Sequence, residues 1–123
     1  MKKITPNIAL EDCEHKVEYY QNVFGGGRLS GGSRTPEGKL LHLELQVNPD
    51  CVLYFNDAFG EVNQGDNISL VLEMDDMEEI ERLYGELQKG GTVRFELQKT
   101  FWGAYHAVIE DRHGIVWSLN YSI

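Results

Sequence analysis

Apolar residues recur at helical spacing in one stretch of the first half of the chain, and strand-like alternation surrounds it. Steps of four, three and four residues predict a helix whose buried face is formed by Cys13, Val17, Tyr20 and Phe24. We expect Asp12 to cap the start of this helix and Gly25 to Gly27 to end it. Alternation predicts four strands: across Ile4, Ile8 and Leu10, from Arg28 to Arg34, from Leu40 to Val47 with Leu41, Leu43, Leu45 and Val47 on one face, and from Cys51 to Asn56.

The second half repeats this order after a polar linker from Asp57 to Asn67. Asp76 with Glu79 three residues later resembles a helix-start box, and Gly90-Gly91 marks the end of the helix. The buried stripe of that helix is expected at Met77, Ile80, Tyr84 and Leu87. Strands are expected at Ile68 to Met74, Val93 to Leu97, Tyr105 to Ile109 and Trp117 to Tyr121, with a hairpin turn at Asp111 to Gly114.

A single constant offset brings the two halves into register, which indicates a duplicated unit. The matching pairs include Tyr20 with Tyr84, Gly26-Gly27 with Gly90-Gly91, His42 with His106, and Val52 with Val116. We therefore predict one domain of class α+β, residues 1–123, made of two βαβββ modules, about 1–58 and about 67–123. Each module should place a helix on one face of a mixed, mostly antiparallel sheet.

Charge and composition narrow the range of partners. The formal net charge is −9, which argues against nucleic acid, because binding to phosphates depends largely on Lys and Arg. No apolar run approaches the roughly 20 residues of a membrane span, and the basic start, Met1 to Pro6, leads into no signal-like apolar region. We expect a cytoplasmic protein that uses neither membrane nor nucleic acid and keeps both cysteines reduced.

Several longer motifs resemble the vicinal-oxygen-chelate superfamily (glyoxalase/bleomycin resistance/dioxygenase), and within it the PhnB-like branch. They are Phe101-Trp102-Gly103, then Val108-Ile109-Glu110-Asp111-Arg112-His113-Gly114-Ile115-Val116-Trp117-Ser118-Leu119, the helix end Val17-Glu18-Tyr19-Tyr20-Gln21-Asn22-Val23-Phe24-Gly25-Gly26, and His42-Leu43-Glu44-Leu45. The resemblance implies the glyoxalase/bleomycin-resistance fold, in which paired modules curl around a cavity. It also implies a homodimer.

Metal-dependent members of that superfamily hold a divalent ion with four side chains. The resemblance places these positions at Thr5, Tyr54, Ser69 and Ser118, and the internal repeat independently pairs Thr5 with Ser69 and Tyr54 with Ser118. None of the four is His, Asp or Glu, and neutral hydroxyls are weak ligands for transition metals. We expect no metal at these positions and no cofactor.

Three other residues are candidates for acid–base chemistry. His42 and Glu44 are two apart on one strand and so share a face, and His106 has the equivalent place in the other module. A cluster of this kind is able to bind a metal or to transfer a proton. The alternative is that they are ordinary hydrogen-bonded residues of a polar face. His15 and His113 are expected to face solvent.

Aromatic residues suggest a ligand pocket, because binding sites are typically apolar clefts with a few polar anchors. They lie on the strands and the loop that the fold curls around its cavity: Tyr54, Phe101, Trp102, Tyr105 and Trp117, with Tyr121 nearby. Core packing or a dimer interface would explain some of the same residues.

Three functions remain open on this basis. The first is a metal-free protein that binds a small molecule of unknown identity. The second is a divergent lyase, isomerase or dioxygenase that uses His42, Glu44 or His106. The third is a structural dimer with no ligand. Whether the chain is an enzyme is undecided by its sequence, since the site and not the fold determines the chemistry.

Overall fold

A computed structural model describes residues 1–123, and in it the chain divides into two units of similar length. The first unit, Met1–Asn63, contains β1 (Asn7–Leu10), α1 (Cys13–Val23), β2 (Arg28–Arg34), β3 (Leu40–Asn48) and β4 (Cys51–Asp57). The second unit, Gln64–Ile123, contains β5 (Leu70–Glu73), α2 (Met77–Gln88), β6 (Thr92–Lys99), β7 (Ala104–Glu110) and β8 (Val116–Ser122). Each unit thus holds one of the expected modules.

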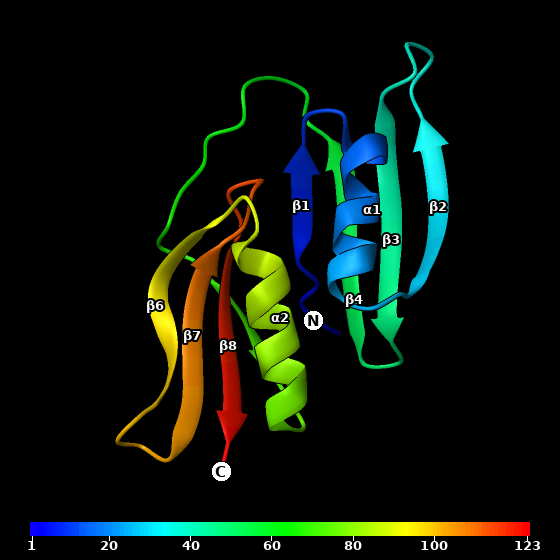
Figure 1. Cartoon of the computed structure of the whole chain (residues 1–123). Coiled ribbons are helices and arrows are strands. Elements are labelled where there is room, and N and C mark those ends of the chain that lie inside the picture. Colours follow the sequence, from blue (N-terminus) through cyan, green and yellow to red (C-terminus); the bar gives the residue numbers. More distant parts are fainter. The chain divides into compact units, whose positions relative to one another are not determined.

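Both units have the same sheet topology (Figure 1). The strand order is β1-β4-β3-β2 in the first and β5-β8-β7-β6 in the second, and each first strand runs parallel to the last. The remaining pairs are antiparallel. The α+β arrangement of two βαβββ modules with mixed, mostly antiparallel sheets is confirmed.

The internal repeat extends to the pairing of individual residues. Leu45 lies opposite Leu53 in the first sheet, and Ile109 lies opposite Trp117 in the second. Both pairs face the helix of their unit, and all four side chains are buried. Because a slip of one residue would turn every side chain to the other face, the shared register shows that the two modules use equivalent positions for their cores.

Gly27 and Gly91, which occupy equivalent places in the repeat, allow the chain to pass close to a neighbouring strand. A Cβ on Gly27 would lie 2.9 Å from the carbonyl oxygen of Gln46, and one on Gly91 would lie 2.5 Å from that of Glu110. Side chains do not approach backbone oxygens so closely, so both positions require glycine.

Each helix covers one face of its sheet with a short buried stripe. The stripes are Cys13, Val17, Tyr20 and Val23 on α1, and Ile80, Leu83 and Leu87 on α2. Phe24 is half-buried rather than core, because α1 ends at Val23 and Phe24 is its C-cap. Met77 and Tyr84 are likewise half-buried, since Leu83 is the residue that faces the sheet. Neither helix is long and apolar enough to cross a lipid bilayer.

A bulge in β3 changes which leucines are buried. Ser33 pairs with His42 and Arg34 with Leu40, so Leu41 is left over between them. Leu40 is 2% exposed and Leu41 is 46% exposed. The expected placement of Leu41 on the face of Leu45 is therefore wrong, because the extra residue shifts the alternation at the start of the strand.

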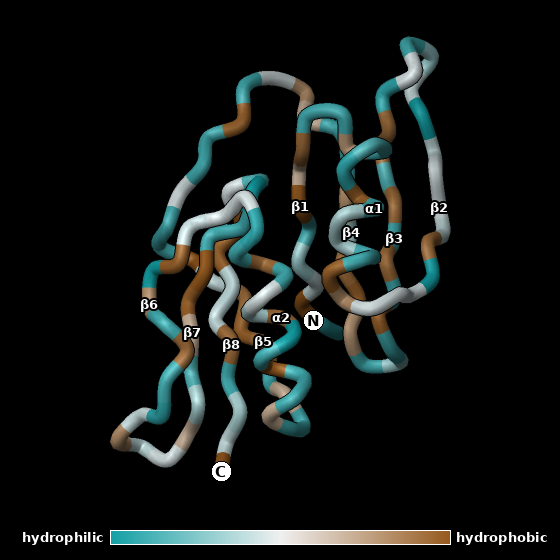
Figure 2. The backbone as a smooth tube through the Cα atoms, in the orientation of Figure 1, coloured by the Kyte–Doolittle hydropathy of each residue, from teal (hydrophilic) through white to brown (hydrophobic).

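Two strands are shorter than the alternation suggested. β1 begins at Asn7, and Ile4 is 86% exposed, because Pro6 has no N–H to contribute to a strand. β5 begins at Leu70, and Ile68 is 74% exposed. Figure 2 draws β2, an edge strand, mainly in white and teal, whereas β3 and β7 carry several hydrophobic residues in brown.

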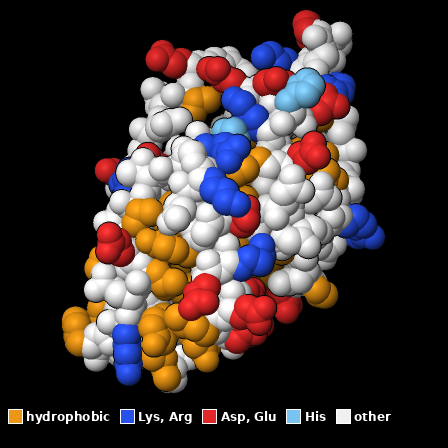
Figure 3. All heavy atoms as spheres, viewed as in Figure 1, with side chains coloured by type: hydrophobic (Ala, Val, Ile, Leu, Met, Phe, Trp, Pro, Cys, Tyr) orange, Lys and Arg blue, Asp and Glu red, His pale blue; other side chains and the backbone are white.

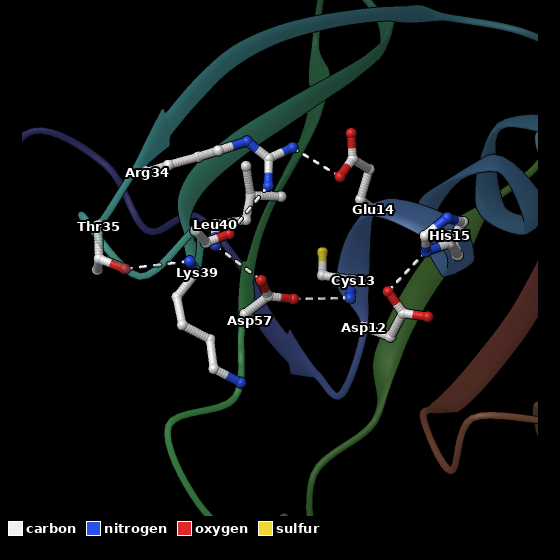
Figure 4. A network of polar contacts seen from close by, with 10 residues as sticks. Asp12, Cys13, Glu14, His15, Arg34, Thr35, Lys39, Leu40 and Asp57 are labelled. Carbon is white, nitrogen blue, oxygen red and sulfur yellow. Dashed lines mark hydrogen bonds and ion pairs between the residues drawn. The ribbon is translucent and has the colours of Figure 1, made fainter.

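Asp57, at the end of β4, supplies the helix cap that we expected from Asp12. Asp12 has a φ of 54° and makes no capping bond. Instead, Asp57 Oδ1 accepts a hydrogen bond from the N–H of Cys13 at 2.8 Å, and its Oδ2 accepts one from the N–H of Leu40 at 2.7 Å (Figure 4). The expectation for Asp12 is wrong, and a residue assigned to the linker joins β4, α1 and β3.

The start of α2 follows the sequence prediction. Asp76 accepts a hydrogen bond from the N–H of Glu79 at 2.8 Å, and Glu79 Oε2 accepts one from the N–H of Asp75 at 3.3 Å. The first of these bonds satisfies an N–H group that has no partner inside the helix, and the second fixes the chain that leads into it.

Candidate functional site

In each unit, the sheet face that does not contact the helix is called here the open face. On the first unit, Glu44 and Tyr54 lie opposite each other on β3 and β4 and belong to this face. Their neighbours Leu45, Leu53 and Phe55 point to the helix, where Phe55 meets Tyr20 with ring centroids 5.4 Å apart. Alternation along the strands therefore separates the buried core from the candidate site.

Three candidate residues come together on the open face of the first unit. His42 Nε2 lies 3.0 Å from Glu44 Oε1, and the His42 ring meets the Tyr54 ring at 4.7 Å and 77°. The side chains of His42 and Glu44 are 40% and 38% exposed, so solutes reach both. An imidazole held by a carboxylate is a common arrangement for proton transfer, and the Tyr54 ring gives it an apolar wall.

His106 has the equivalent place in the second unit but very different neighbours. Val108, not a carboxylate, lies opposite Ser118 where Glu44 lies opposite Tyr54 in the first unit. The His106 ring contacts the rings of Phe95 at 5.7 Å and Trp102 at 5.8 Å. Its Nδ1 is buried and has no hydrogen-bond partner. The structure thus does not join His106 to His42 and Glu44 within one unit.

A bulge in β6 explains why Phe95 faces His106. Val93 pairs with Ile109, which points to the helix, and Phe95 pairs with Val108, which points away from it. Arg94 is the extra residue between them, and its Nη2 donates a hydrogen bond to Glu110 Oε1 at 2.6 Å. Strict alternation predicts that Val93 and Phe95 share one face. The sequence therefore did not identify Phe95 as a residue of the open face.

The aromatic residues expected to form one pocket lie on two different faces. Trp117 is fully buried on the helix side, and its Nε1 donates to Asp111 Oδ2 at 2.8 Å. Tyr105 shares that side, because β7 pairs with β8 without a bulge, and stacks on Tyr121 at 6.5 Å and 11°. The structure therefore assigns Trp117 to the core and keeps it away from the open face.

Phe101 and Trp102 lie in the turn between β6 and β7. Phe101 is 97% exposed and Trp102 is 55% exposed, and their rings meet edge to face at 5.0 Å. Figure 3 shows hydrophobic side chains gathered at the lower left, the end where Figure 1 draws this turn and the C-terminus. Of these two rings, Trp102 is the one that contacts His106.

The positions that the family resemblance gives to a metal do not suit one here. Ser118 Oγ donates to Ser69 Oγ at 2.9 Å, so these two hydroxyls bind each other. Thr5 and Tyr54 likewise offer only hydroxyl oxygens, which do not replace the imidazole or carboxylate ligands that transition metals need. No group of three or more His, Cys, Asp or Glu side chains is arranged to hold a metal ion.

The remaining histidines and the cysteines lie outside these faces. His15 is 78% exposed, as expected, and its hydrogen bond with Asp12 raises its pKa. His113 is half-buried in its turn, where its N–H binds Asp111. Burial, and then the nearby Asp57 carboxylate, raises the pKa of Cys13 to about 11, so its thiol stays protonated. Cys51 is exposed at the start of β4.

A lysine near the start of the chain also belongs to the first open face. Lys3 Nζ lies 5.7 Å from the centroid of the Tyr54 ring. No motif or periodicity in the sequence connects Lys3 with Tyr54, which is distant from it along the chain. A contact of this kind becomes visible only in the folded chain.

Known proteins resemble this chain over nearly its full length. The uncharacterized protein Mb0911c of Mycobacterium bovis is 26% identical over 129 residues, which cover 94% of this chain and 80% of that protein. The crystal structure of protein PA1353 from Pseudomonas aeruginosa superposes with a TM-score of 0.85 at 27% identity, covering 99% of this chain and 98% of the other.

A second solved structure has the same fold. It is a Bacillus cereus protein described as a putative 3-demethylubiquinone-9 3-methyltransferase, PhnB protein, with a TM-score of 0.83 and 21% identity, covering 98% of this chain and all of that one. The family model of the Glyoxalase/Bleomycin resistance protein/Dioxygenase superfamily matches residues 5–119. With this match over two equivalent βαβββ modules, the chain belongs to the glyoxalase/bleomycin resistance/dioxygenase superfamily, also called the vicinal-oxygen-chelate superfamily.

Proposed function

We propose that this protein binds small organic molecules on the open faces of its sheets without using a metal ion. The observation that carries the proposal is the cluster around His106. Two aromatic rings cover a histidine whose Nδ1 has no partner, although buried polar atoms are normally hydrogen-bonded. The hydroxyl groups at Ser69 and Ser118 support the metal-free part of the proposal.

The cluster around His106 suits a planar ring that carries a polar group able to pair with a ring nitrogen of the histidine. Leaving a buried donor or acceptor unpaired costs about 1–3 kcal/mol, which a matching ligand group would recover on displacing the side chains that cover Nδ1. Trp102 is half exposed on a turn, so its ring is positioned to cover a bound ring as well as His106. Aromatic pairs contribute about 0.5–1.5 kcal/mol beyond the area that they bury.

Replacing Trp102 with alanine tests this site. In a thermal-shift screen of indole, benzimidazole and related planar compounds in the presence of a chelator, we expect compounds that stabilise the wild type. A ligand at 100 times its Kd adds about 2.7 kcal/mol. The Trp102→Ala variant should bind the same compounds up to about tenfold more weakly, since one stacked ring is worth up to about 1.5 kcal/mol.

Phe101→Ala is the matched control. Phe101 is the neighbouring aromatic residue of the same turn but is almost fully exposed and does not contact His106 in the structure. Its replacement should leave affinity within about twofold. If no compound stabilises the wild type in the presence of the chelator, metal-free binding is wrong.

The pair His42 and Glu44 supports a second candidate function, acid–base catalysis. Their 3.0 Å contact fixes the imidazole on an accessible face, as in general-base sites. If the chain catalyses a proton transfer, His42→Ala should lower kcat about 100-fold or more, and Glu44→Gln should lower it less. Equal turnover by wild type and His42→Ala, in an assay that detects turnover, would exclude this pair as the catalyst.

A further inference from the structure

The open face of the first unit already holds a positive charge over an aromatic ring. The ammonium group of Lys3 lies 5.7 Å from the centroid of Tyr54. Attraction between a cation and the face of a ring acts up to about 6 Å. Lys3 is exposed and belongs to residues 1–6, which form neither helix nor strand. The charge is therefore carried by a segment that contributes little to the core.

The surroundings of Tyr54 favour a cation for a second reason. Glu44 lies directly opposite Tyr54 across β3 and β4, so the two side chains are neighbours on one face. His42 binds the Glu44 carboxylate and places its ring against Tyr54. A ring face and a carboxylate thus lie side by side on an accessible surface, in a protein with a net charge of −9.

The equivalent face of the second unit has neither feature. Ser118 replaces Tyr54, and Val108 replaces Glu44 at the same register. The difference lies between two copies of one structural unit, so the ring and the carboxylate are not required by the fold itself. Their pairing in the first unit is a specific property of that face.

We propose that the face formed by Tyr54, Glu44 and His42 binds an organic ammonium ion, and that Lys3 is an internal occupant which such a ligand displaces. This inference rests on the proposed function and names a ligand class for one of its faces. The ring face of Tyr54 attracts the charge, and the Glu44 carboxylate neutralises it. A ligand ammonium must compete with the Lys3 ammonium, which is always present at the site.

Choline and 3,3-dimethylbutan-1-ol form the test pair, because they have nearly the same shape and differ in charge. Binding to the protein is measured by NMR titration at low salt. We expect choline to bind at least tenfold more tightly than the neutral alcohol, with the largest chemical-shift changes at His42. Equal binding of the two compounds would overturn the proposal.

Two lysine variants distinguish specific competition by Lys3 from a general effect of net charge. Lys3→Met removes the ammonium from the ring, and Lys2→Met makes the same change of net charge one residue earlier. We expect Lys3→Met to tighten choline binding about threefold to tenfold and Lys2→Met to change it less than twofold. Equal effects of the two replacements would show that Lys3 is no specific competitor.

Ring and carboxylate variants complete the test. Tyr54→Phe keeps the ring face and should bind choline as the wild type does, whereas Tyr54→Leu and Glu44→Gln should each bind at least fivefold more weakly. Circular dichroism checks that each variant is folded. Planar uncharged ligands that stabilise the wild type while choline does not bind would refute the ammonium site and leave the proposed function intact.

Discussion

Replacing Asp57 with alanine is expected to lower the free energy of unfolding of the first unit by about 2–4 kcal/mol, because a hydrogen bond to a charged group is worth about 1.5–3 kcal/mol. The change removes two such bonds, from the N–H groups of Cys13 and Leu40, both of which are buried. The loss of a helix cap alone costs about 0.5–2 kcal/mol. Urea unfolding followed by circular dichroism measures the loss.

Asp57→Asn shows whether the charge itself matters. An amide has one acceptor oxygen and an NH2 group, which would meet one of the two backbone N–H donors. We therefore expect this variant to recover less than half of the loss. Asp12→Asn is the matched control at the same helix start. Asparagine tolerates the φ of 54° as aspartate does, and the change should have little effect on stability because Asp12 makes no capping bond. Equal losses at the two positions would contradict the assignment of the cap.

The pH dependence of stability follows from the same two bonds. The N–H of Leu40, and then that of Cys13, hold the pKa of Asp57 below its ordinary value, although partial burial acts in the opposite direction. The stabilisation is therefore complete above the unfolded-state pKa of about 3.9 and is lost as the pH falls through the lower pKa of the folded state. The difference in stability between wild type and Asp57→Asn should be constant from pH 7 to about 5 and should narrow below about pH 4.

Trp117→Ala is expected to destabilise the second unit by about 3–5 kcal/mol, the range for removing a large aromatic side chain from a core. Trp117 is fully buried, and its N–H is a hydrogen-bond donor to Asp111, a carboxylate that is itself 3% exposed. The variant would create a cavity and leave one oxygen of Asp111 without this donor. Denaturant unfolding of purified protein measures the effect.

Trp117→Phe separates packing from hydrogen bonding. It keeps most of the apolar contact and removes the donor, so a loss of about 1–2 kcal/mol is expected. Neither change should alter ligand affinity in variants that remain folded, because Trp117 faces the helix side. A Trp117→Phe variant that is fully stable but binds ligand poorly would place Trp117 in the binding site after all.

The element order and the duplication could be predicted from sequence because both leave regular patterns along the chain. Two helical stripes, alternating strands and glycine-marked ends are short-range patterns, and the constant offset between the halves identified equivalent positions within the one chain. The pair His42 and Glu44 was likewise predictable, since residues two apart on a strand share a face.

The features that could not be predicted depend on single extra residues in strands and on contacts between residues far apart in the sequence. The bulges at Leu41 and Arg94 each reversed the face of neighbouring side chains, and no local pattern marks where such an insertion occurs. Asp57 is far from Cys13 along the chain, so their bond cannot be read from a capping motif. Trp102 and Trp117 are both aromatic residues of the second module, but only the fold separates core from open face.

The position of Asp57 determines where the segment between the two modules can change in sequence and length. Asp57 is bonded to two other elements, and the N–H of the next residue, Ala58, binds the carbonyl of Leu10 at 2.9 Å. Beyond them, Phe59 is 64% exposed, and a side chain at Gly60 would meet open space. We therefore expect insertions or deletions after Ala58 to be tolerated. A change one or two residues earlier would disturb the hydrogen bonds by which Asp57 joins α1 and β3 to β4.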